Sequence, residues 1–97
     1  MKSQKQQSQP LSQVNKKWQP PKTIAPEHEL FIKRVGEKLK ALRLEKKLNV
    51  TQAAGLYGIS RSLCYLLEDG KVYFTISSLL HVLDKHDIAA IDFFRDL

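Results

Sequence analysis

The chain is 97 residues long, contains 42% hydrophobic residues and carries a formal net charge of +6. This length allows one small domain. It has neither an apolar run long enough to span a membrane nor an apolar N-terminal segment typical of a secretory signal. We therefore expect neither a membrane protein nor a secreted one. The single cysteine, Cys64, fits a protein of the reducing cytoplasm.

The positive charge is concentrated near the N-terminus. Residues 1–25 contain five Lys and no acidic residue, whereas residues 26–97 contain 11 Lys and Arg against 10 Asp and Glu. A basic chain favours a nucleic-acid partner, but here most of the excess charge lies in the first 25 residues.

Residues 1–25 are rich in Gln, Ser, Lys and Pro and have few apolar side chains. Such a segment buries too little apolar surface to offset the entropy lost on ordering, so we predict a disordered tail. Trp18 stands out because lysines flank it. It either contacts a nucleic acid or a partner protein, or packs loosely on the domain or on nothing.

A first helix is predicted from residue 26 to about residue 46. Pro26 suits the first helical position, and acidic residues in the first turn favour the positive end of the helix dipole. Apolar residues recur at helical spacing and predict a buried stripe. The stripe consists of Phe31, Val35, Leu39 and Leu42, widened by Leu30, Ile32 and Leu44.

Residues 49–70 predict two short helices joined by a tight turn. Asn49 and Gln52 have the spacing of a capping box at the start of a helix over about 50–57. Gly58 suits the left-handed conformation that ends a helix. Ser60 then caps a second helix over about 61–69, which Gly70 ends.

The two faces of this helix pair differ in character. The inward positions carry small or apolar residues, namely Ala53, Ala54, Tyr57, Ile59, Cys64 and Leu67. The outward positions of the second helix carry Arg61, Ser62, Tyr65 and Leu66. This arrangement predicts a helix-turn-helix, whose second helix usually enters the major groove of DNA.

Two more helices are predicted toward the C-terminus. Thr75 caps a helix over about 76–85, with Ile76, Leu79, Leu80 and Leu83 on its buried face. A short helix follows over about 90–96. It carries more large apolar residues than one face can bury, so we predict that their exposed part is a dimer surface. The candidates are Ile91, Phe93, Phe94 and Leu97.

The sequence shows no catalytic or metal-binding constellation. Its three histidines have no Cys or carboxylate partners at ligand spacing, and no glycine-rich phosphate loop occurs. We therefore predict no enzyme activity, no metal and no cofactor.

The order of these elements resembles the Cro/phage-repressor type of helix-turn-helix domain, also called the XRE family. The resemblance covers roughly residues 35–94. It rests on residues 39–49, on Ala54 with the turn at 58–60, and on residues 67–70, 75–83 and 92–94. It implies an all-α, compact five-helix domain over residues 26–97, with the helix-turn-helix at about 49–70.

The resemblance also implies roles for particular residues. Arg43 would pair with Glu68 and fix how the second helix is presented. Arg61, Ser62 and Leu66 would read bases, with Tyr65 beside them. Phosphate contacts would come from Thr51 or Gln52, because Val50 replaces the Gln common in the family. We also expect Lys46, Lys47 and Lys71 near phosphates.

Two functions remain open at this point. The first is a DNA-binding transcriptional regulator that reads double-stranded DNA with the helix over about 60–69, as a homodimer on paired half-sites. The second is a protein-binding adaptor, or an antitoxin-like partner, on the same fold. In that case the partner would bind through the tail, Trp18, Leu66 and the two Phe residues near the C-terminus, Phe93 and Phe94.

Overall fold

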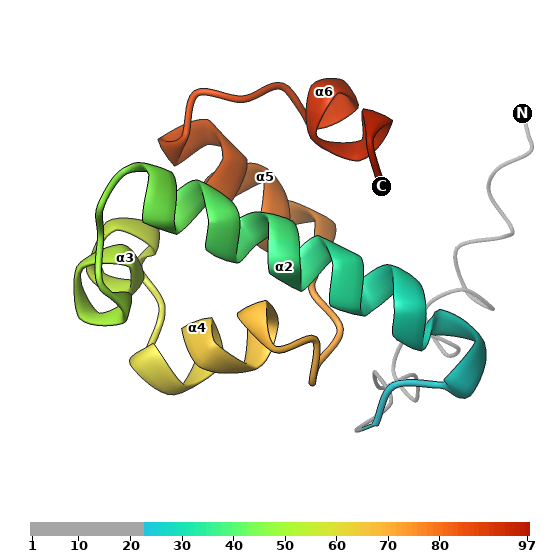
Figure 1. The fold of residues 1–97 in the computed structure, drawn as a ribbon. Helices are drawn as coiled ribbons and strands as arrows, with labels where there is room; N and C mark the ends of the chain where they lie inside the picture. The colour runs from blue at the N-terminus through green and yellow to red at the C-terminus, as the bar shows by residue number, and fades with distance from the viewer. Residues whose placement is uncertain (1–22) are drawn as a thin grey trace, which may run out of the picture.

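The computed structural model describes residues 23–97, and most of the predicted tail lies outside the described residues. The described part contains a short 3₁₀ helix and five α-helices (Figure 1). The elements are η1 (Pro26–His28), α2 (Glu29–Glu45), α3 (Val50–Tyr57), α4 (Arg61–Glu68), α5 (Ile76–Lys85) and α6 (Ala90–Arg95). The predicted all-α, five-helix fold is confirmed. The predicted first helix differs in starting with the separate turn η1, and α4 and α6 each end one residue early.

The long helix α2 forms the centre of the domain. In Figure 1 it crosses the molecule, with α3 and α4 below it and α6 above it. Helix α4 packs on α2 and α3, whereas α5 packs on α3 and α6. The side chains most completely buried between these helices are Val35, Cys64, Leu83 and Phe93. A single core therefore holds the helix-turn-helix against α2.

Two predicted apolar stripes are shifted in the structure. On α2 the buried positions are Ile32, Val35, Leu39 and Leu42, while Phe31 is 46% exposed. On α5 the buried positions are Leu79, Val82 and Leu83, while Ile76 and Leu80 are exposed. The placements of Phe31, Ile76 and Leu80 on buried faces were wrong, and so were those of Leu30 and Leu44, which are exposed as well. Helical spacing defines an apolar face only to within about one position, and the angle at which neighbouring helices cross selects the buried set.

The predicted dimer surface also needs a correction. Phe93 is 1% exposed and belongs to the core. Lys38 from α2 holds it there, because its ammonium group donates to the Phe93 carbonyl oxygen at 2.6 Å and lies 5.2 Å from the ring centroid. Phe93 therefore cannot contact a second subunit. Ile91 is 71% exposed, and Phe94 and Leu97 are half-buried.

Within residues 23–97, the structure contains no helix that is both long enough and apolar enough to cross a membrane.

Candidate nucleic-acid interface

Local side-chain caps define the ends of α3 and α4. The Gln52 backbone N–H donates to Asn49 Oδ1 at 2.8 Å, and the Asn49 backbone N–H donates to Gln52 Oε1 at 2.9 Å. Gly58 ends α3 with a φ of +73°, which a residue with a Cβ adopts only at a cost. The Leu63 backbone N–H donates to Ser60 Oγ at 3.0 Å and starts α4. These interactions fix where α3 begins and ends and where α4 begins, and all of them act between residues close in sequence.

A buried ion pair joins α2 to α4. Arg43 donates from Nε to Glu68 Oε2 at 2.8 Å and from Nη2 to Glu68 Oε1 at 3.0 Å. Its Nη1 donates to the Leu48 carbonyl oxygen at 2.9 Å, in the loop before α3. The hydrogen bond to Glu68 raises the pKa of Arg43 above its ordinary value. One guanidinium thus ties together three segments, and it fixes α4 relative to α2 and to the start of α3.

Cys64 completes this buried cluster. Its thiol lies 3.8 Å from Glu68 Oε2 and is 2% exposed. Burial, with the nearby Glu68 carboxylate, raises the pKa of the Cys64 thiol to about 11. The thiol therefore stays protonated near neutral pH, and it behaves as a small core residue rather than as a nucleophile.

Gly36 allows α4 to approach α2 closely, a role that the sequence analysis missed. A Cβ at Gly36 would lie 2.5 Å from the carbonyl oxygens of both Leu67 and Glu68. At Gly70, just after α4, a Cβ would lie 2.9 Å from the Lys33 Cα. Both glycines let backbones meet directly. The only sequence signal for Gly36 was an isolated Gly inside a strongly helical pattern.

The outer face of α4 presents the residues expected to read bases. Arg61, Ser62, Tyr65 and Leu66 are all exposed. Thr51 and Gln52, in the first turn of α3, are exposed as well. Arg61 Nη1 donates to Thr51 Oγ1 at 3.4 Å, so the first turns of the two helices lie next to each other on this surface. The structure therefore brings six of the expected site residues onto one surface, formed by the first turn of α3 and the outer face of α4.

The three expected phosphate-contacting lysines are exposed but lie apart along the chain. Lys46 and Lys47 follow α2 and lead into α3, and Lys71 follows α4. Within residues 49–70, Arg61 is the single basic residue. Since Glu68 is neutralised by Arg43, the exposed Asp69 is the one acidic side chain left on this stretch. The positive charge available to DNA therefore lies mainly at the edges of the helix-turn-helix.

A second buried polar pair joins α3 to the end of α5, and the sequence analysis missed it too. Tyr57 Oη and His86 Nε2 are 2.5 Å apart, and both side chains are buried. Burial raises the pKa of Tyr57 to about 12 and lowers the pKa of His86. The nearby positive charge of Lys46 lowers the His86 pKa further. Which of the two groups donates in this hydrogen bond depends on the tautomer of the imidazole.

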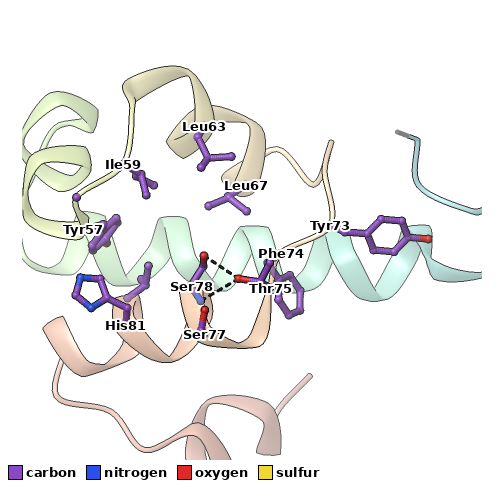
Figure 2. Close-up of a pocket in the computed structure, with 12 residues that line it drawn as sticks. Tyr57, Ile59, Leu63, Leu67, Tyr73, Phe74, Thr75, Ser77, Ser78 and His81 are labelled. Carbon is purple, nitrogen blue, oxygen red and sulfur yellow. Dashed lines mark hydrogen bonds between the residues drawn. The ribbon is translucent and has the colours of Figure 1, made fainter. Parts of the chain in front are cut away.

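An open groove separates α4 from α5. We call it the α4–α5 groove; it has a volume of about 700 Å³. Its floor is apolar and its α5 side carries hydroxyl groups, as Figure 2 shows. The apolar lining is Ile59, Leu63, Leu67, Phe74 and Val82, and the hydroxyl groups belong to Thr75, Ser77 and Ser78. Tyr73 lies at one end of the groove (Figure 2).

The same Tyr73 anchors the start of the described chain. The Ala25 backbone N–H donates to Tyr73 Oη at 3.1 Å, and His28 Nδ1 lies 2.7 Å from that oxygen. The loop after α4 is thereby fastened to η1, and Thr23 and Ile24 lie near the end of α4.

Together, the capped α3–α4 pair, the glycine turn and the ion pair to α2 define a helix-turn-helix fold that resembles the Cro/phage-repressor type. Comparison with solved structures confirms this resemblance. The chain is similar to the restriction-modification controller protein C.AhdI from Aeromonas hydrophila. The identity is 26% and the TM-score 0.63, over 67% of this chain and 98% of the other.

Two further structures share the fold. An HTH_3 family transcriptional regulator from Vibrio cholerae is 25% identical with a TM-score of 0.62, over 69% of this chain and 38% of the other. The wild-type controller protein C.Esp1396I is 23% identical with a TM-score of 0.60, over 67% of this chain and 84% of the other. No family model matches the chain, and no curated protein does. These solved structures are described as restriction-modification controllers and a transcriptional regulator, and their likeness confirms the predicted resemblance and fold.

Proposed function

We propose that this chain is a DNA-binding transcriptional regulator that reads the major groove with α4. The observation that carries the proposal is the rigid presentation of α4. Its outer face is exposed, while its inner face is tied to α2 by the Arg43–Glu68 pair and by close backbone contact at Gly36. A recognition helix needs this kind of support, because base contacts demand a fixed side-chain geometry. The solved controllers and the HTH_3 regulator with this fold support the same function.

Arg61 is the principal candidate for base recognition. Its guanidinium can donate two hydrogen bonds to the O6 and N7 atoms of a guanine, and Thr51 already contacts it at 3.4 Å. Ser62 can serve a base or a phosphate, and Tyr65 lies beside it on the exposed face. Leu66 offers only apolar contact, for example to a thymine methyl group. We therefore expect a short recognition sequence with one dominant guanine in each half-site.

Phosphate contacts would hold the domain in register. Gln52 uses its side-chain oxygen in the cap of α3, which leaves its NH₂ group free to donate to a phosphate. Thr51 offers a hydroxyl group in the same turn. Lys46, Lys47 and Lys71 supply charge at the two edges, and the tail lysines add attraction that does not depend on sequence. If all five tail lysines met phosphates, they would add about 4–5 to the slope of log affinity against log salt, at roughly 0.9 each.

A selection of bound sequences from a random duplex pool, followed by fluorescence anisotropy, tests the proposal. We expect an enriched motif, weaker binding at higher salt, and loss of preference at one base pair in Arg61→Ala. Lys71→Ala is the matched control, because removing a phosphate contact weakens binding to all sequences about equally. Absence of any enriched motif at low salt would rule out sequence-specific binding.

We also propose that the regulator binds as a homodimer on paired half-sites. The candidate contact is the exposed part of the C-terminal face, in which Ile91 is 71% exposed and Phe94 and Leu97 are half-buried. Light scattering of Ile91→Asp tests this contact without disturbing the core. A monomeric variant would support it, and an unchanged mass would exclude Ile91 from the interface. As a DNA-binding regulator, the protein would act in the cytoplasm, where the Cys64 thiol stays reduced.

One observation favours the alternative function, a protein-binding adaptor. The outer face of α4 exposes 55% of Tyr65 and 40% of Leu66 beside a single Arg. Such a face suits an aromatic-rich protein interface as well as DNA. Anisotropy with the selected duplex and a scrambled duplex separates the two functions, because an adaptor that binds DNA only through its basic tail would not distinguish the two sequences.

A further inference from the structure

The α4–α5 groove is an apolar surface that the helices themselves leave open. Leu63 and Leu67 project into it from α4, because α4 packs on α2 and α3 rather than on α5 (Figure 2). Phe74 and Val82 line the opposite side. Its volume of about 700 Å³ falls within the range of sites that enclose a compact ligand or several side chains.

The described chain begins near Tyr73, which lines one end of this groove. Thr23 and Ile24 lie against Gly70 and Lys71, directly after α4. Tyr73, which binds the Ala25 backbone N–H, also lines the end of the groove. Thr23, the first described residue, therefore lies near the end of the groove that Tyr73 lines.

We propose that residues 18–22 fold back along α4 and that the Trp18 side chain occupies the α4–α5 groove. Five Cα–Cα steps separate Trp18 from Thr23, which allows a span of up to about 17 Å. Leu67 lies three residues before Gly70, or about one helical turn of roughly 5 Å. The groove is thus within reach of Trp18 without any movement of the anchored residues.

The chemistry of the groove matches an indole ring. Trp18 is the single Trp of the chain and the one aromatic residue of the first 22. An indole combines a large apolar body with one N–H donor that needs an acceptor when buried. The floor of the groove supplies apolar contact, and the exposed Ser77 hydroxyl on its α5 side supplies an acceptor.

Docking of Trp18 would also place charge where the helix-turn-helix lacks it. Lys16 and Lys17 directly precede Trp18 and would lie close to α4. On the exposed face of α4, Arg61 is the one basic residue. This consequence rests on the proposed function, whereas docking itself does not and can be measured without DNA.

Trp18 fluorescence of the full-length chain tests the docking. We expect emission shifted to shorter wavelength, and weaker acrylamide quenching, than for N-acetyltryptophanamide. Ser77→Phe fills the groove from an exposed position and should abolish both differences. Ser62→Phe makes the same change on the outer face of α4 and should leave them intact. Circular dichroism checks that both variants keep their helices.

Three results would overturn the proposal. Emission equal to that of the free analogue means that the groove is not occupied by Trp18. A blue-shifted emission that persists in Ser77→Phe means that Trp18 is buried elsewhere. A shift that disappears on dilution means that a second copy, and not the same chain, is the partner. The melting temperature of Trp18→Ala provides an independent test of docking. If Trp18 is docked, its removal should lower the melting temperature, and if it is not docked, the melting temperature should not change.

Discussion

Removal of Glu68 is expected to be the most damaging single change near the recognition helix. In Glu68→Ala the Arg43 guanidinium, which is 7% exposed, keeps only its bond to the Leu48 carbonyl oxygen. Breaking one side of a buried ion pair costs about 3–5 kcal/mol, because the remaining charge is buried without a partner. Small domains have a total stability of about 5–15 kcal/mol. Glu68→Ala should therefore lose a large part of the free energy of unfolding.

The neighbouring Asp69 provides the matched control. Asp69 is exposed and caps no helix through its side chain, so Asp69→Ala should change stability by less than about 0.5 kcal/mol. At 4–8 °C per kcal/mol for a domain of this size, the melting temperatures of the two variants should differ by more than about 10 °C. Circular dichroism at 222 nm, with heat and with urea, measures both.

A double variant separates the charge from the packing. Arg43→Met combined with Glu68→Leu replaces the pair by apolar side chains and leaves no buried charge. Such replacements are often neutral or stabilising, so the double variant should recover most of the stability that Glu68→Ala loses. Equal shifts of the melting temperature in Glu68→Ala and Asp69→Ala would refute the reasoning, since the Arg43–Glu68 pair would then contribute nothing to stability.

Three further outcomes are expected. Gly36→Ala should lower the melting temperature because its methyl group meets carbonyl oxygens of α4 at 2.5 Å, whereas Gly55→Ala, with nothing within 4 Å, should stabilise α3 by about 0.5–1 kcal/mol. The urea midpoint should fall as the pH drops below about 6.5. The pKa of buried His86 is lowered, so below that pH the unfolded chain binds a proton on this imidazole more readily than the folded chain does. Above that pH the contribution of His86 to stability is fully present. His86→Gln should flatten this dependence, and His81→Gln, at an exposed position, should retain it. Arg61→Ala should lose about 1–3 kcal/mol of binding free energy for the selected sequence, as measured by anisotropy.

The groove changes how the basic N-terminal segment is understood. Sequence composition alone separates it from the domain, because it has too few apolar residues to form a core. The structure adds an anchor at Tyr73 and an apolar groove next to that anchor. Both features lie in the loop after α4 and on α5, and neither has a signature in a linear pattern.

The sequence alone determined the local structure of this protein. The Asn49–Gln52 capping box, the Gly58 turn and the Ser60 cap act between residues at most four positions apart, so their spacing identifies them directly. The order of these signals also predicted the five-helix class, which comparison with solved structures confirmed. The exposed positions of α4 followed from helical periodicity once its start was known.

Only the tertiary structure decided which faces pack and what lies between the helices. Helical periodicity does not distinguish Phe31 from Ile32 as the inward residue, since the two differ by about 100° around the axis and the crossing helices select one of them. The Tyr57–His86 bond joins residues 29 positions apart, and the contact at Gly36 involves carbonyl oxygens more than 30 residues away. Such contacts depend on helix crossing angles and distances, which arise from the packing of the whole core and not from any local pattern.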